Sequence, residues 1–221
     1  MVLRTLTLSL GVFVAITLTG CGHETAPTPT PAARPNPIAN PTLAATSKDP
    51  IAAVTSVVFD GSRSTSSASG GITNYQWSFG DGTQSSGVVV QHTFSTPGTK
   101  TITLTATDAN GTSAPGSVTV TIKDMGGNWR TQFNIQTRTY SLIQNGTVLT
   151  GTYTNTSLSG QTWTVNGSID SSRRLTITAT YPGETTVVLS NAIVDATASS
   201  LTGVTHGGSA DNQTLTYQRV Q

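Results

Sequence analysis

From residue 51 onward, the chain alternates apolar and polar residues with a period of two. The clearest run is Thr101–Thr107, in which Ile102, Leu104 and Ala106 lie at every second position. Because successive side chains of a β-strand point to opposite faces of the sheet, this pattern predicts half-buried strands. Glycine-rich turn signals separate the runs: Asp60-Gly61, Gly80-Asp81-Gly82, Asn145-Gly146 and Gly207-Gly208. We therefore expect an all-β protein.

The composition is close to neutral. Only 10% of the residues are charged, and 11 Lys and Arg stand against 10 Asp and Glu, which leaves a formal charge of +1. Threonine and serine occupy many polar positions of the alternating runs, as they do on the solvent faces of secreted β-proteins. No block of like charges occurs, so the sequence favours neither nucleic acid nor a strongly charged substrate.

The chain opens with an export signal. Residues 1–4 carry one positive charge at Arg4, and residues 5–20 are uncharged and largely apolar. A basic tip followed by an apolar run of this length is typical of a signal peptide. A membrane-spanning helix needs about 20 predominantly apolar residues, whereas this run is shorter and diluted by threonine, serine and glycine. We expect residues 1–20 to be removed on export.

The end of this signal, Leu18-Thr19-Gly20-Cys21, resembles the lipobox of bacterial lipoproteins. The resemblance implies cleavage before Cys21 and attachment of lipid to its thiol. Cys21 is the single cysteine of the chain, so no intramolecular disulfide can form. Gly22 follows instead of aspartate, which by resemblance to envelope lipoproteins favours the outer membrane where the organism has one. We expect the folded part to be periplasmic or surface-exposed.

Residues 21–44 are expected to form a tether between the lipid and the folded part. Seven of the ten prolines lie between residues 22 and 50. Proline fixes φ and lacks the backbone donor, which excludes helix and interior strand. Such a segment favours an extended polyproline conformation of ~3.1 Å per residue, a semi-rigid spacer.

Residues 45–123 resemble a PKD domain, an immunoglobulin-like β-sandwich. The motifs that carry the resemblance are Trp77-Ser78-Phe79-Gly80-Asp81-Gly82, His92-Thr93-Phe94, Pro97-Gly98 and the run 104–108. The residues to which it gives structural roles are Trp77, Phe79, Gly80, Asp81, Gly82, His92, Phe94, Pro97, Gly98 and Asp108. Short strands at regular spacing, joined by turn residues, independently favour a sandwich.

The residues of this motif also make sense individually. Trp77 and Phe79 alternate on one strand face and would fill the core. Asp81 can accept hydrogen bonds from turn N–H groups, and His92 can form a hydrogen bond nearby. Two departures from the family pattern occur: Lys100 replaces the usual aromatic residue, and the loop 60–67 lacks the additional aspartates of calcium-binding relatives. We therefore expect no calcium or other metal site.

Residues 126–221 are expected to form a small antiparallel meander, with an eight-stranded up-and-down barrel favoured over a sandwich. The expected strands are 128–136, 139–145, 147–155, 161–169, 173–181, 184–195, 197–206 and 213–220. Three similar segments place Gly151, Gly167 and Gly203 inside strands. Glycine weakens a strand interior unless it marks a bulge or a sharp bend, and closed barrels need such bends.

The segments Asn128-Trp129 and Leu149–Tyr153 resemble avidin, streptavidin and lipocalin-like barrels. The candidate ligand contacts are Trp129, Tyr153, Trp163 and Tyr181; the alternative is that they are core or rim aromatics. We expect a filled interior, because one apolar face of about a dozen large residues can pack a small barrel. These residues are Phe133, Ile135, Leu142, Val148, Trp163, Val165, Leu175, Ile177, Val187, Leu189, Leu201 and Leu215.

No catalytic or metal-binding sequence motif is present. His206 with Asp195 or Asp211 and a serine could form a triad, but a serine-rich chain offers such combinations readily, and we expect His206 to be exposed and without function. The predicted function is that of a lipid-anchored, non-catalytic envelope protein without cofactor. Its PKD-like module would contact proteins or polysaccharide. The alternatives are a small-ligand carrier and, less favoured, a hydrolase.

Overall fold

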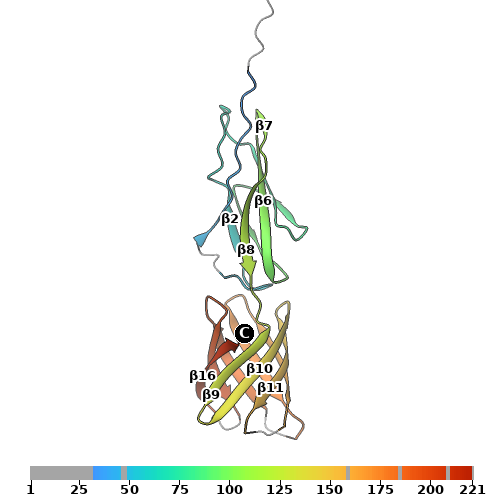
Figure 1. Cartoon of the computed structure of the whole chain (residues 1–221), viewed down its shortest axis with the longest axis vertical. Helices are drawn as coiled ribbons and strands as arrows, with labels where there is room; N and C mark the ends of the chain where they lie inside the picture. The colour runs from blue at the N-terminus through green and yellow to red at the C-terminus, as the bar shows by residue number, and fades with distance from the viewer. Residues whose placement is uncertain (1–31, 46–48, 158–159, 184–185, 208–209, 221) are drawn as a thin grey trace, which may run out of the picture. The chain divides into compact units, whose positions relative to one another are not determined.

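The structure is a computed structural model that describes residues 32–45, 49–157, 160–183, 186–207 and 210–220. Cys21 and the export signal lie outside the described residues. Every described strand pairing is antiparallel apart from one isolated bridge between Ile51 and Lys123. The fold is all-β, as the alternation predicts, and consists of a two-sheet domain followed by a closed barrel (Figure 1).

The described residues of the first domain form eight strands in two sheets. The strands are β1 (Thr42–Leu43), β2 (Val57–Asp60), β3 (Asn74–Ser78), β4 (Gln84–Ser86), β5 (Val89–His92), β6 (Gly98–Asp108), β7 (Gly111–Thr112) and β8 (Gly116–Ile122). One sheet has the order β1-β2-β5. The other has the order β4-β3-β6-β7, with β8 also paired to β6.

The two sheets enclose an aromatic core. Phe59 from β2 packs against Trp77 from β3 at a ring-centroid distance of 6.0 Å and against Phe79 at 5.6 Å. Trp77 is fully buried, and its Nε1 donates a 2.8 Å hydrogen bond to the carbonyl of Gly87. The predicted core positions of Trp77 and Phe79 are therefore confirmed.

The sandwich begins earlier than residue 45. Strand β1 pairs with β2, and Ile38 forms a bridge with Thr65. A Cβ built on Gly116 would lie 2.4 Å from the carbonyl oxygen of Ala39, so the segment before β1 packs tightly against β8. Residues 38–44, assigned to the tether from their prolines, thus belong to the folded domain.

The second domain is a closed barrel of eight strands. They are β9 (Gly127–Phe133), β10 (Gln136–Asn145), β11 (Val148–Asn155), β12 (Trp163–Ile169), β13 (Arg174–Thr180), β14 (Val187–Val194), β15 (Ser200–His206) and β16 (Gln213–Val220). Each strand pairs with the next in sequence, and β16 closes the barrel on β9. The predicted up-and-down barrel is confirmed.

Close backbone approaches occur where glycines interrupt the strands. Gly151 has φ +151°, and a Cβ there would lie 1.9 Å from the carbonyl oxygen of Ser141 on the neighbouring strand. At Gly203, an added Cβ would lie 2.6 Å from the Cβ of Ala192. Ala192 lies in β14, at the point where the pairing register with β15 shifts. Such glycines and bulges allow the bending that a closed barrel needs.

Side chains from all eight strands occupy the barrel interior. Two residues predicted for the interior lie outside it: Ile135 is 99% exposed and Val148 is 53% exposed. Ile135 lies in the turn after Asn134, whose φ of +55° takes the chain out of the strand. Val148 points outward because its neighbour Leu149 occupies the inward position. Phe133 is half-buried, and the other nine predicted residues are buried.

Candidate functional site

The predicted motif of the first domain forms one hydrogen-bonded cluster. His92 Nε2 lies 2.7 Å from Asp81 Oδ2, and Thr83 Oγ1 donates to Asp81 Oδ1 at 2.6 Å. The His92 ring stacks on Phe79 at 4.2 Å and meets Phe94 edge-on at 4.6 Å. Burial disfavours ionisation of Asp81, but hydrogen bonds from Thr83 and His92 outweigh it and lower its pKa to about 2.

We call the cluster of Asp81, Thr83 and His92 the turn lock, because its hydrogen bonds hold one turn in place. A proton relay needs both ring nitrogens of a histidine, one toward the base partner and one toward the nucleophile. Here Nε2 of His92 contacts both Asp81 and Thr83. Asp81 also accepts the backbone N–H of Thr83 at 3.0 Å. These contacts fix the turn between β3 and β4, in the structural role that the sequence predicted.

The remaining motif residues also shape turns. Gly80 has φ +74°, and a Cβ there would lie 2.6 Å from the Thr101 carbonyl. Gly98 has φ +107° and begins β6. Asp108 Oδ1 accepts the N–H groups of Asn110 and Gly111 at 2.7 and 3.1 Å. The hydroxyl of Ser66 donates to Asp108, and this hydrogen bond lowers the pKa of the carboxyl.

Three of the four aromatic residues proposed as ligand contacts, Trp129, Tyr153 and Trp163, follow the barrel register. Trp129 on β9 is paired with Tyr140, Tyr140 with Tyr153, and Tyr153 with Trp163. Because barrel strands are tilted, such a row of partners climbs from one end of the barrel towards the other. Tyr153, Trp163 and the half-buried Tyr181 meet at one end, with centroid separations of 6.1 and 6.0 Å. Trp129 lies at the start of the row, away from them.

Sequence reasoning missed a buried arginine of the barrel, two residues before Tyr140 on β10. Arg138 is 2% exposed, and its guanidinium lies 5.2 Å from the centroid of the Phe133 ring. Burial raises the pKa of the nearby Tyr140 and Tyr217 phenols well above their usual value. The alternation would have located Arg138, because it shares the inward phase of Tyr140 and Leu142.

His206 is exposed, as predicted, but it has hydrogen-bond partners. Its Nε2 lies 2.9 Å from Ser190 Oγ, and its Nδ1 lies 3.1 Å from Asn212 Oδ1. Neither Asp195 nor Asp211 contacts the ring: Asp211 instead accepts the N–H of Gly207. The triads considered from the sequence are therefore not assembled with an aspartate.

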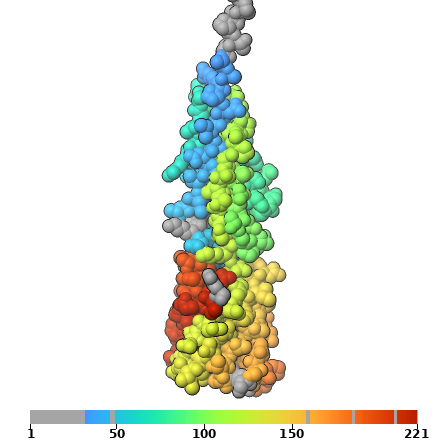
Figure 2. All heavy atoms as spheres, in the orientation of Figure 1, coloured from blue at the N-terminus to red at the C-terminus, as the bar shows by residue number. Residues whose placement is uncertain are grey.

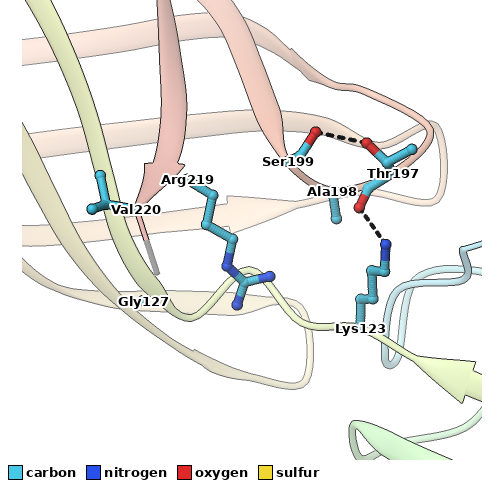
Figure 3. A pocket seen from close by; sticks show the side chains of 7 residues that line it. All are labelled: Lys123, Gly127, Thr197, Ala198, Ser199, Arg219 and Val220. Carbon is cyan, nitrogen blue, oxygen red and sulfur yellow. Dashed lines mark hydrogen bonds between the residues drawn. The ribbon is translucent and has the colours of Figure 1, made fainter.

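A pocket of about 500 Å³ lies at one end of the barrel, and Figure 3 shows the side chains that line it. It is bordered by the start of β9, the loop between β14 and β15, the end of β16 and the residue that follows β8. The lining residues are Lys123, Gly127, Thr197, Ala198, Ser199, Arg219 and Val220. Sequence reasoning did not find this pocket. The net charge of the chain, which is close to zero, gives no indication that Lys123 and Arg219 lie together at this pocket.

Both cations are held by neighbouring groups. Nη2 of Arg219 lies 2.8 Å from Asp124 Oδ1 and also donates to the Gly126 carbonyl, and Nη1 donates to the Asp124 carbonyl at 3.0 Å. The guanidinium also lies 5.7 Å from the Trp129 ring centroid, a favourable cation–π distance. Nζ of Lys123 lies 2.7 Å from Asp49 Oδ1 and donates to the Thr197 carbonyl at 2.7 Å (Figure 3).

The pocket is also lined by hydroxyl groups that are ordered by Asp195. Thr197 Oγ1 and Ser199 Oγ lie 2.9 and 2.8 Å from Asp195 Oδ2, and 2.7 Å from each other. Asp195 also accepts the N–H of Ser199 at 2.8 Å. Burial opposes ionisation of Asp195, but the hydrogen bonds from Ser199 and its neighbours prevail and lower its pKa well below the usual range.

A second polar surface covers the outer face of the five-stranded sheet. The buried residues Trp77, Ile102 and Val120 fix the inner face, so the alternate positions point outward. These outward residues are Asn74, Gln76, Ser78, Gln84, Ser86, Thr99, Thr101, Thr103, Thr105, Thr107, Thr112, Ser117, Thr119 and Thr121. Within these strands, every outward side chain bears a hydroxyl or an amide and none is charged. We call this set the hydroxyl face.

The register aligns the side chains of the hydroxyl face. Thr101 is the partner of Thr119, and Thr99 is the partner of Thr121. The hydroxyls of Thr99 and Thr121 are 3.3 Å apart. In Figure 2, atoms of the segment around residues 98–122, in green, lie on the side turned to the viewer.

Comparison with known proteins assigns the first domain. Residues 38–124 match the model of the PKD domain, and this part of the chain is a PKD domain. No curated protein matches the chain. One matching solved structure is described as showing the promiscuous specificity of carbohydrate-binding modules from the β-sandwich superfamily. It has 19% identity and a TM-score of 0.35, and the match covers 84% of this chain and 85% of that one.

Two further observations concern the described residues alone. None of their helical segments is long and apolar enough to cross a membrane. Among the same residues, no group of three or more histidine, cysteine or acidic side chains is arranged to hold a metal ion. The expectations of no metal and no catalysis remain predictions.

Proposed function

We propose that the protein is a non-catalytic binding protein of the cell envelope, anchored by lipid on Cys21, whose PKD domain contacts neutral polysaccharide. The single observation that carries the polysaccharide assignment is the hydroxyl face. Polysaccharide hydroxyls both donate and accept hydrogen bonds, and so do threonine, serine, asparagine and glutamine side chains. The threonine methyl groups add apolar contact for the C–H groups of a sugar ring.

The absence of charge on the hydroxyl face matters as much as its hydrogen-bonding groups. A charged side chain pressed against a neutral polymer would lose hydration without an opposite charge to compensate for it. The strands lie ~4.8 Å apart, and alternate residues of one strand lie ~6.7 Å apart. Thr99, Thr101, Thr119 and Thr121 therefore offer a regular set of weak contacts. Several such contacts along one polymer give useful affinity through multivalency.

The anchor and the prolines support the envelope location. The Leu18–Cys21 motif supplies the site of lipid attachment, and the proline-rich residues before the PKD domain supply distance from the membrane. More than one acyl chain gives stable anchoring, because each buried CH₂ contributes ~0.8 kcal/mol. A membrane-anchored module with a neutral polar face suits contact with a polymer that surrounds the cell.

Retention on insoluble neutral polysaccharide tests this proposal. The full-length protein in detergent micelles is compared with the double variant Thr101→Lys/Thr119→Lys, which introduces two charges into the hydroxyl face. Gln91→Lys is the matched control, because Gln91 is exposed on β5 in the other sheet. We expect the double variant to lose at least about tenfold in affinity, equivalent to 1.4 kcal/mol, and the control to bind normally. Equal binding by all three proteins would exclude the hydroxyl face.

A second candidate function, carriage of a small ligand by the barrel, is favoured by one specific observation. At the end where Trp163 and Tyr181 meet, Trp163 Nε1 and Gln161 Oε1 are buried and have no hydrogen-bond partner among the described residues. Buried polar atoms are normally paired, so a donor and an acceptor left in this state could serve a ligand. Mass spectrometry of denatured, freshly purified protein would detect such a ligand, and a Trp163→Phe variant should then carry less of it.

A further inference from the structure

The lining of the pocket in Figure 3 combines two cations with two hydroxyl side chains, and Lys123 lies beside Thr197. Lys123 and Arg219 line it, and their carboxylate partners Asp49 and Asp124 are not part of its lining. An occupant would therefore meet both positive groups directly. The charge complementarity of such a lining favours an anionic group.

The guanidinium of Arg219 keeps hydrogen-bond donors for an anionic group. Its contacts with Asp124 and Gly126 use Nη2 and one N–H of Nη1. Nε–H and the second N–H of Nη1 make no hydrogen bond within the described residues, and they lie on different edges of the guanidinium. A carboxylate oxygen would therefore accept one charge-assisted hydrogen bond from Arg219. The existing contacts and the Trp129 ring hold the guanidinium in place, so little conformational entropy is lost on binding.

The hydroxyl groups of the lining determine what else the occupant must carry. Thr197 and Ser199 have one hydroxyl proton each, and both protons are used inside the triangle with Asp195. Toward the pocket, these two side chains therefore offer oxygen lone pairs, which accept hydrogen bonds. A suitable ligand therefore carries hydroxyl groups that donate hydrogen bonds, in addition to its carboxylate.

The remaining lining and the size narrow the ligand further. Val220 provides apolar surface, which suits the C–H groups of a sugar ring. A volume of about 500 Å³ is within the range of small-molecule sites. It is far larger than an isolated inorganic anion requires. A carboxylate, several hydroxyls and a compact ring that bears C–H groups occur together in a uronic acid.

We propose that this pocket binds a uronate sugar, with its carboxylate on Arg219 and Lys123 and its hydroxyls on Thr197 and Ser199. This site differs from the hydroxyl face and does not depend on it. The ligand is accordingly an acidic saccharide unit, free or within a polymer, whereas the hydroxyl face would contact neutral chains.

Calorimetric titration of the full-length protein in detergent micelles tests this site, with glucuronate, glucose and acetate at equal ionic strength. We expect glucuronate to bind at least about tenfold more tightly than either glucose or acetate. Arg219→Gln and Lys123→Gln should each weaken glucuronate binding about tenfold. The matched control is Arg130→Gln, an exposed arginine on β9 outside the pocket, and it should bind normally. Ser199→Ala should weaken glucuronate binding without affecting the response to acetate.

Arg219 also forms hydrogen bonds with Asp124 and Gly126. The stability of Arg219→Gln is therefore compared with that of the parent protein by thermal melting. If Arg219→Gln melts early, Lys123→Gln decides the question. Equal binding of glucose and glucuronate, or unchanged glucuronate binding in a folded cation variant, would overturn the proposal. Acetate binding as tight as glucuronate binding would overturn the sugar assignment. Thr101→Lys/Thr119→Lys should leave glucuronate binding intact, so failure of this site and failure of the hydroxyl face are distinguishable.

Discussion

Replacing Trp77 by alanine tests the core of the PKD domain most directly. Trp77 is 0% exposed, lies 6.0 Å from the ring of Phe59, and is paired across the sheet with Leu104. On one side of the ring lies Gly61, where an added Cβ would be 3.2 Å from Trp77 Cζ2. Gly61 has no side chain that could move into the space left by the indole. The cavity should therefore remain largely open.

The expected loss can be worked out from these contacts. Truncating a buried tryptophan to alanine costs ~3–5 kcal/mol. The Gly87 carbonyl also loses the 2.8 Å hydrogen bond from Nε1, which adds about 1 kcal/mol. A domain of this size has a total stability of roughly 5–15 kcal/mol. Trp77→Ala should therefore remove a large part of it and lower the melting temperature by at least ~15 °C.

Differential scanning calorimetry of the full-length chain measures this effect. Trp77→Phe keeps an aromatic ring but loses the hydrogen bond, so its loss should be smaller, about 1–2 kcal/mol. Val89→Ala, at a residue that is 55% exposed, is the control and should melt normally. Fluorescence of Trp129 and Trp163 reports on the barrel in the same samples. An unchanged, cooperative transition in Trp77→Ala would refute the argument and would place the indole outside the core.

Three further predictions concern the barrel, the turn lock and the anchor. Gly151→Ala should lower the melting temperature of the barrel strongly, since a Cβ would lie 1.9 Å from the Ser141 carbonyl, whereas Gly70→Ala, with no atom within 4 Å, should not. Asp81 has a folded-state pKa of about 2 against an ordinary 3.8, so its ionised form stabilises the fold above about pH 4, and this contribution is lost as the pH falls toward 2. Denaturant titrations across this range should show the loss. Asp81→Asn should reduce the dependence and leave the part contributed by Asp108 and Asp195, whose pKa values are also lowered. Cys21→Ser should block lipid attachment and leave the export signal uncleaved, as measured by intact mass and membrane fractionation, and normal processing with membrane retention would contradict the lipoprotein interpretation.

The period-two alternation predicts most of the fold, because a half-buried strand has apolar residues at every second position of the sequence. In Thr101–Thr107 every apolar residue is buried and every threonine faces outward. The alternation does not show where a strand stops. Ile135 continues an apolar pattern past the end of β9, yet it lies in a turn. Strand β1 was missed because its two residues, Thr42 and Leu43, are too few to alternate.

The pocket was less accessible to sequence reasoning because its residues are far apart in the chain. Lys123, Ser199 and Arg219 lie on separate segments that only the closure of β16 on β9 brings together. One signal was available. Leu215, Tyr217 and Arg219 alternate on β16, and the first two are buried. That phase places Arg219 on the inner side at the end of the barrel, where a guanidinium needs polar partners.

The two proposed surfaces should respond differently to salt, and this difference follows from their residues. The hydroxyl face has no charge to screen, so its contacts with a neutral polymer should persist as ionic strength rises. Arg219 and Lys123 act on an anion through partly exposed ion pairs, with side chains 28% and 31% exposed. Interactions between such groups weaken as the Debye length falls from ≈ 10 Å at 0.1 M to ≈ 3 Å at 1 M salt. Retention on neutral polysaccharide should therefore be nearly unchanged between these concentrations, while glucuronate binding should fall several-fold. If both responses fell together, neutral and acidic sugars would share one charged site, and the assignment of two separate surfaces would be wrong.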